Sequence, residues 1–163
     1  MISEKSLAAF AKEVAKYPFE QRQSAVMACL QIIQQEQGFV SPESESLVAD
    51  YLGMAPMAVH EVTSFYNMYN QKAVGKYKLN VCTNLPCQLR YGAHALTHLK
   101  EKLGIDANQT TPDGLFTLQE CECLGACADA PVMLVNDTNM CSFMTDDKLD
   151  QLVDGLRSME VKS

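Results

Sequence analysis

Residues 1–70 carry apolar side chains at helical spacing in four stretches, so that each stretch can fold as a helix with one apolar side. The positions are Leu7, Phe10, Ala11 and Val14; Val26, Leu30 and Ile33; Leu47, Val48, Tyr51 and Leu52; and Val59, Val62, Tyr66 and Tyr69. Ser3 and Ser41 are suited to begin helices, and Gly38 and Gly53 to end them. Because each apolar side needs a partner, residues 1–74 are predicted to form a small helical bundle.

The pattern changes after Gly75. Tyr77, Leu79 and Val81 alternate with polar residues, which is typical of a half-buried strand. A helix carrying Leu89, Gly92, Leu96 and Leu99 is predicted next, then strands over 115–118 and 132–135, then a helix that begins after Thr145. The order β-α-β-β-α predicts a mixed domain over residues 75–163 and makes the whole chain an α+β protein.

Composition and charge narrow the class of protein. The 163 residues are 47% hydrophobic and 20% charged, as in a globular protein that builds a core. The net charge is −7, and nucleic-acid binding relies on Lys and Arg to neutralise phosphates, so the charge argues against it. No apolar run approaches the roughly 18 residues that span a bilayer, and the N-terminus resembles no targeting peptide. A cytosolic protein is predicted, which would reach a membrane only through partners.

Seven cysteines carry the candidate chemistry. An odd number with no secretory signal argues against a disulfide framework. The spacings are Cys82-x4-Cys87 and, thirty-five residues further on, Cys121-x-Cys123-x3-Cys127. Each group follows a predicted strand end, where two loops can converge on one edge of a sheet. The absence of any C-x2-C step weakens zinc knuckles and thioredoxin-type dithiols. Spacing alone favours an iron–sulfur site and leaves zinc and no metal open.

Three motifs carry a resemblance to a known family. They are residues 81–87 (VCTNLPC), 111–118 (TPDGLFTL) and 122–127 (ECLGAC), the last followed by Ala130-Pro131. Together they resemble the 24-kDa-type subunit of respiratory NADH:quinone oxidoreductase (complex I), in the thioredoxin-like [2Fe-2S] ferredoxin family. The likeness extends over nearly the whole chain, including residues 31–40 and Ser64-Phe65-Tyr66. It implies a thioredoxin-like C-terminal half and one [2Fe-2S] cluster whose ligands are Cys82, Cys87, Cys123 and Cys127.

The resemblance also implies a role. Relatives carry single electrons beside a flavin-bearing subunit that oxidises NADH, next to a multi-cluster iron–sulfur subunit, peripherally on the cytoplasmic side of a bacterial inner membrane. FMN and NAD are then expected in the partner only, and residues 1–74 are expected to dock on partner subunits. The sequence agrees in lacking G-x-G-x-x-G and G-x-x-x-x-G-K-[ST] motifs, so no catalytic residue and no nucleotide or substrate site is assigned to this chain.

Several alternatives stay open. Equivalent subunits occur in NAD-linked hydrogenases and formate dehydrogenases, and a zinc-stabilised interaction module is an alternative of another class. A helix-turn-helix regulator is disfavoured, because residues 58–70 contain no Lys or Arg. Cys29 lies in an apolar helical stripe and is predicted to be a core residue, and His94 and His98 are expected to be a solvated pair rather than a metal site. The sequence leaves open whether Cys121 can substitute as a ligand, whether Cys141 is buried or exposed, and whether Pro131 is cis or trans. It also leaves open an interface or a core position for six residues: Met54, Met57, Phe65, Tyr66, Met68 and Tyr69.

Overall fold

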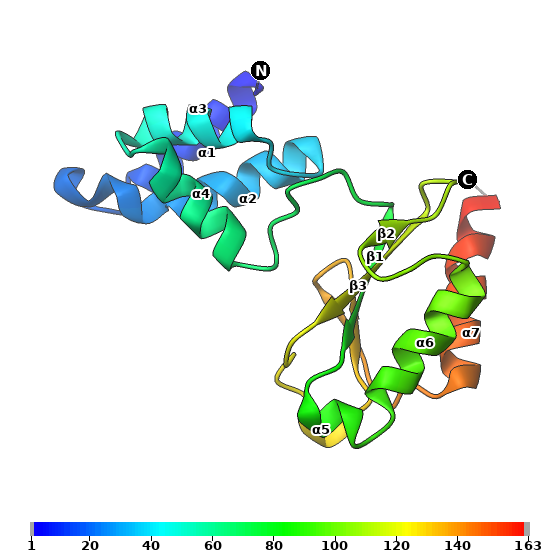
Figure 1. Ribbon diagram of the computed structural model, residues 1–163. Helices are drawn as coiled ribbons and strands as arrows, with labels where there is room; N and C mark the ends of the chain where they lie inside the picture. Colours follow the sequence, from blue (N-terminus) through cyan, green and yellow to red (C-terminus); the bar gives the residue numbers. More distant parts are fainter. Residues whose placement is uncertain (1, 162–163) are drawn as a thin grey trace. The chain divides into compact units, whose positions relative to one another are not determined.

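The computed structural model describes residues 2–161 and divides into two compact units between Ala73 and Val74. The first unit contains four α-helices and one 3₁₀ segment (Figure 1). They are α1 (Glu4–Val14), η1 (Phe19–Ala25), α2 (Val26–Gln37), α3 (Pro42–Leu52) and α4 (Pro56–Phe65). Within this unit α1 packs on α2, and α3 packs on both α2 and α4. The prediction that this part of the chain forms a small helical bundle is therefore confirmed.

The predicted helix ends are found for α1, α2 and α3. The Ser3 hydroxyl accepts a hydrogen bond from the Ser6 backbone N–H, and the Ser41 hydroxyl does the same for Ser44. Gly38 ends α2 in the left-handed region at φ +83°, where a side chain would be strained. The core of the unit contains Phe10, Cys29, Leu30, Ile33, Val48, Leu52 and Val59, all at most 1% exposed.

Helix α4 is shorter than predicted. It ends at Phe65, and Tyr66 has extended backbone, so the expectation that Tyr66 and Tyr69 extend its apolar side is wrong. The reason is tertiary, because the following backbone bonds to the end of α2: Gln34 donates to the Met68 carbonyl at 2.8 Å. Tyr69 is nevertheless buried and donates its hydroxyl to the Met27 carbonyl.

The candidate interface residues separate into core and surface. Tyr69 is buried, and Met54 packs against the core of the first unit. Phe65 and Met57 are 80% and 66% exposed, and Phe65 contacts Tyr66 edge-on at a ring separation of 5.0 Å. Only the exposed members are therefore free to meet a partner.

The second unit is a five-stranded mixed sheet with helices against one face (Figure 1). The strands are β1 (Tyr77–Cys82), β2 (Gln109–Thr110), β3 (Phe116–Cys121), β4 (Met133–Val135) and β5 (Asn139–Cys141), in the order β2-β3-β1-β4-β5. Strands β1 and β3 are parallel, and the other neighbours are antiparallel. The helices are α5 (Leu85–Gln88), α6 (Gly92–Leu103) and α7 (Asp146–Val161).

The core of the second unit lies between the sheet and helices α6 and α7. Leu79 and Phe116 of the sheet meet Leu99 of α6 and Leu149 of α7, all fully buried. The sequence did not predict β2, β5 or α5, which are two to four residues long. It placed the end of its second strand at Leu118, whereas this strand, β3, continues to Cys121 because β1 pairs with it along its whole length. The Ala130–Pro131 peptide bond is cis, one of the two forms left open by the sequence.

Between residues 2 and 161, no helix is both long enough and apolar enough to cross a membrane.

The buried carboxylate of Glu45 joins α3 to α4. Removing one of its hydrogen-bond donors should destabilise the first unit. The Thr63 hydroxyl, 2% exposed, donates to Glu45, whose carboxylate also meets His60 Nδ1 at 3.0 Å. Thr63→Val keeps the shape but leaves this carboxylate short of one donor, so the free energy of unfolding should fall by about 1–3 kcal/mol. Urea denaturation followed by far-ultraviolet circular dichroism measures it.

Ser64→Ala is the matched control, because the exposed Ser64 hydroxyl bonds only to carbonyls of its own helix. Its effect should stay within about 0.5 kcal/mol. Equal losses of unfolding free energy in Thr63→Val and Ser64→Ala would contradict a special role for the buried carboxylate.

Candidate metal centre

The parallel pairing of β1 and β3 positions the cysteine loops. Cys82, the last residue of β1, lies directly beside Cys121, the last residue of β3. Because parallel strands end at the same edge of a sheet, both loops leave from one place. The Thr83 N–H continues the ladder by donating to the Cys121 carbonyl at 3.1 Å. The structure therefore brings the two cysteine groups, which are far apart in sequence, to one edge.

The first thiol pair is buried. Cys82 and Cys87 are each 1% exposed, and Cys87 lies on the short helix α5. Burial, together with the contact to Cys82, raises the pKa of Cys87 to about 11. Gly92 at the start of α6 passes so close that a Cβ there would stand 2.8 Å from the Cys82 carbonyl oxygen. A residue larger than glycine at this position would push the two cysteine-bearing segments apart.

The second thiol pair is exposed. The sulfur atoms of Cys123 and Cys127 lie 3.5 Å apart, and the Gly125 N–H donates to the Cys123 sulfur at 3.4 Å. Gly125 adopts φ +76°, a conformation that favours glycine and lets its backbone approach the sulfur. The hydrogen bond with Cys123, with some desolvation, raises the pKa of Cys127.

The two pairs belong to one neighbourhood. Charges at Cys127 and Cys82 each contribute to the raised pKa of Cys87. Buried Ala130 and Val132 pack against Cys82 and Cys87, and the half-buried residues Cys121, Leu124 and Ala126 complete this apolar group. Within the described part of the chain, no three His, Cys, Asp or Glu residues gather closely enough to hold a single metal ion. The sulfurs form two pairs, and this fits a two-iron cluster held by four thiolates.

The remaining cysteines and the two histidines of α6 each have contacts of their own. Cys121 stands beside Cys82, and burial plus nearby negative charge raise its pKa to about 12. Cys29 is fully buried in the core of the first unit, as predicted, and Cys141 lies on β5. His94 and His98 each pair with an aspartate of α7, at 3.0 Å and 2.9 Å.

Sequence reasoning missed the residues that connect the two loops. Thr83 Oγ1 donates to Glu120 at 2.6 Å, and Asn84 Nδ2 donates to Glu122 at 2.8 Å. The signal was present in the E-C-E-C order of residues 120–123, where acids alternate with cysteines. The polar residues Thr83 and Asn84, directly after Cys82, were the second part of that signal.

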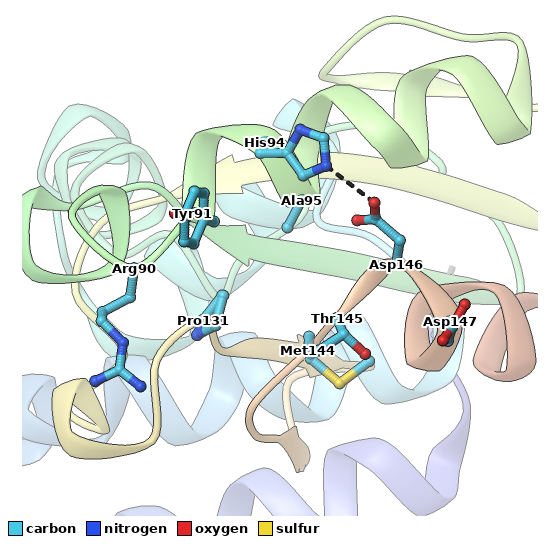
Figure 2. A pocket seen from close by; sticks show the side chains of 9 residues that line it. All are labelled: Arg90, Tyr91, His94, Ala95, Pro131, Met144, Thr145, Asp146 and Asp147. Atoms are coloured by element: carbon cyan, nitrogen blue, oxygen red, sulfur yellow. Dashed lines mark hydrogen bonds and ion pairs between the residues drawn. The ribbon is translucent and has the colours of Figure 1, made fainter.

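A cavity of about 400 Å³ lies beside Pro131 (Figure 2). Arg90, Tyr91, His94, Asp146 and Asp147 provide its polar lining. Figure 2 shows His94 turned toward Asp146, to which it is bonded, with Arg90 on the opposite side of Tyr91. The cavity contains no thiol, and its lining carries charges of both signs.

Comparison with known proteins gives a consistent result. The sequence profile of the thioredoxin-like [2Fe-2S] ferredoxin family matches residues 10–157. NADH-quinone oxidoreductase subunit 2 of Thermus thermophilus is 43% identical over 144 residues, which cover 88% of this chain and 80% of that protein. An NADH-quinone oxidoreductase subunit of Rickettsia conorii is 39% identical over 146 residues, which cover 89% of this chain and 87% of that protein.

A relative from a eukaryote and a solved structure extend the comparison. The mitochondrial NADH dehydrogenase [ubiquinone] flavoprotein 2 of Dictyostelium discoideum is 41% identical over 92% of this chain and 62% of its own length. The crystal structure of an air-oxidized NAD+-reducing [NiFe]-hydrogenase has a TM-score of 0.71 at 17% identity. It covers 83% of this chain but only 23% of the hydrogenase chain, so it supports the fold alone.

The exposure and the pKa of each cysteine thiol predict the order in which the thiols react when the chain holds no iron. Burial raises the pKa of Cys29 and of Cys87 to about 11 from the ordinary 9.0, which lowers their thiolate fraction about a hundredfold at neutral pH. The exposed Cys123 should therefore be alkylated at least about tenfold faster than either. Timed alkylation with peptide mass spectrometry measures the order, and the unfolded chain, where the rates should converge, is the control. Faster labelling of Cys29 than of Cys123 would contradict the burial described here.

Proposed function

The chain belongs to the thioredoxin-like [2Fe-2S] ferredoxin family, and on that premise we propose that it holds one [2Fe-2S] cluster and carries single electrons. The proposed ligands are Cys82, Cys87, Cys123 and Cys127. The observation that supports this best is the parallel register of β1 and β3, which starts both cysteine loops at one sheet edge. When bound, a four-thiolate [2Fe-2S] centre takes up or gives up one electron.

The surrounding residues suit this role. Ala130 and Val132 keep water from the buried pair, and a drier site strengthens every electrostatic effect on the sulfurs. The Gly125 N–H points at the Cys123 sulfur, where it stabilises negative charge. Since a thiol binds iron as thiolate, Cys87 would give up its proton when the cluster binds.

The relatives support a wider assembly. The relatives from Thermus thermophilus and Rickettsia conorii are named as subunits of NADH-quinone oxidoreductase. In this proposal a flavin-bearing partner holds FMN and NAD and oxidises NADH, and a multi-cluster iron–sulfur subunit lies alongside. No catalytic residue of this chain takes part, and the complex lies peripherally on the cytoplasmic side of a bacterial inner membrane.

Residues 1–74 are proposed to dock on partner subunits. The exposed Phe65 and Met57 support this, because aromatic and methionine side chains are enriched in interfaces. The equivalent subunit of an NAD-linked hydrogenase or formate dehydrogenase is the alternative within the same class. A zinc-stabilised module is the alternative of another class, which metal analysis separates.

The ligand assignment predicts distinct results for two neighbouring cysteines. The purified chain should contain iron and sulfide in equal amounts and give an EPR signal after dithionite reduction. Cys123→Ser should lose or distort that signal, since a ligand is changed. Cys121→Ser, two residues away, should leave it essentially unchanged and serves as the matched control. A colourless protein containing zinc would contradict the proposal, and the reverse order of effects would move the ligand to Cys121.

Because the proposal places the NADH and FMN sites in a partner subunit, it predicts whether NADH can reduce the isolated chain. NADH should not reduce the cluster of the isolated chain, because hydride transfer needs the partner's flavin. After co-purification with the flavin-bearing subunit, NADH should generate the reduced cluster's EPR signal under anaerobic conditions. Adding a separate flavoprotein that does not bind this chain is the control. Direct reduction of the isolated chain by NADH would contradict a partner-held NADH site.

A further inference from the structure

Two side-chain hydrogen bonds cross from one cysteine loop to the other. Thr83 Oγ1 to Glu120 and Asn84 Nδ2 to Glu122 join segments thirty-seven and thirty-eight residues apart. Thr83 and Asn84 directly follow Cys82, and Glu122 directly precedes Cys123. We name these two bonds the cross-loop clamp. Both acceptors are carboxylates, and hydrogen bonds to charged groups are the stronger class.

Asn84 occupies a position where its side chain would normally serve another purpose. It is the N-cap residue of α5, and asparagine is among the residues preferred there because its side chain accepts from the first helical N–H groups. No such capping bond is made by the Asn84 side chain. Its amide instead donates to Glu122 across the gap between the loops.

The sheet alone does not position the second thiol pair. The backbone ladder ends with the Thr83 N–H bond to the Cys121 carbonyl, two residues before Cys123. The far end of that loop is held separately, by the Phe143 N–H bond to the Asp129 carbonyl at 2.8 Å. Between these points lie Cys123 and Cys127, both exposed. Glu122 lies at the near end of this stretch and accepts the bond from Asn84. It therefore connects this end to the loop that carries Cys87.

We propose that Glu122 is a positioning residue for the cluster, acting through Asn84, with the Glu120–Thr83 bond extending the same clamp. This inference rests on the proposed function. The clamp holds the loop of Cys82 and Cys87 in register with the loop of Cys123 and Cys127, so that four sulfurs meet one cluster in a single geometry. Glu122 itself touches no iron and takes no part in electron transfer.

Exchanging donor and acceptor tests the clamp without changing side-chain length. In Asn84→Asp two carboxylates face each other, so iron release to a chelator should be at least about tenfold faster than in the wild type, and the EPR lines should broaden. Glu122→Gln keeps an acceptor oxygen for Asn84 and should stay within about twofold. In the double variant the glutamine amide donates to the new aspartate, so the rate and the line shape should return to within about threefold of wild type.

Glu101→Gln is the charge control, because Glu101 is exposed on α6 and its loss should leave the rate unchanged. The inference is overturned if Asn84→Asp releases iron at the wild-type rate, or if the double variant is no slower than Asn84→Asp. Should Asn84→Asp not fold, as judged by circular dichroism, Asn84→Ala and Glu122→Ala replace it. Their double variant should then be no faster than the faster single variant, and multiplying effects would overturn the inference.

Failure of this inference differs from failure of the proposed function. A wild-type chain purified without iron and sulfide would remove the proposed function. A wild-type chain that holds its cluster, with variants at residues 84 and 122 acting independently, would remove only the clamp.

Discussion

The candidate site depends on one constraint, the parallel register that sets Cys82 beside Cys121. An antiparallel pairing of the same strands would send the two loops from opposite ends of the sheet. The register is maintained by apolar side chains along β1 and β3, such as Leu79 and Leu118, which are buried against α6 and α7. A shift by one residue would turn these side chains to the other face, so the core specifies where the cysteines meet.

The two thiol pairs differ in burial, and the difference suits the proposed electron carrier. Cys82 and Cys87 lie in an apolar group with Ala130 and Val132, while Cys123 and Cys127 face outward. A cluster held between them would be dry on one side and close to the surface on the other. Charge and hydrogen bonding around the sulfurs then become the means by which the chain adjusts the cluster's potential.

Helix α6 supports the buried pair and also pairs with α7 through polar side chains. Its first residue, Gly92, allows the helix to approach the backbone of both buried cysteines. Further along, His94, His98 and Lys102 face Asp146, Asp150 and Asp154 of α7 at intervals of four residues. These pairs are partly or fully exposed to solvent, so each contributes little by itself, and the apolar contacts beneath them hold the helices to the sheet.

Local signals along the chain were enough to predict the elements whose causes lie within a few residues. The Ser41 cap, the Gly53 terminus and the alternation along Tyr77 to Val81 act over a few residues, so the longer helices, the first strand and the grouping of the cysteines could be predicted. The family resemblance supplied the expected cluster type and the four cysteines proposed as its ligands. The length of α4, the extension of β3 to Cys121 and the short strands β2 and β5 followed no local signal.

The way in which these elements meet depends on contacts between residues that are far apart in the sequence. The end of α4 depends on Gln34, which lies thirty-four residues before Met68, its acceptor. The unequal burial of the thiol pairs and the bond from Asn84 to Glu122 likewise join distant segments. Such contacts arise from the packing of a whole unit. The acids that alternate with the cysteines were visible in the sequence, but the spacing of residues along the chain does not say which distant side chain each acid will meet.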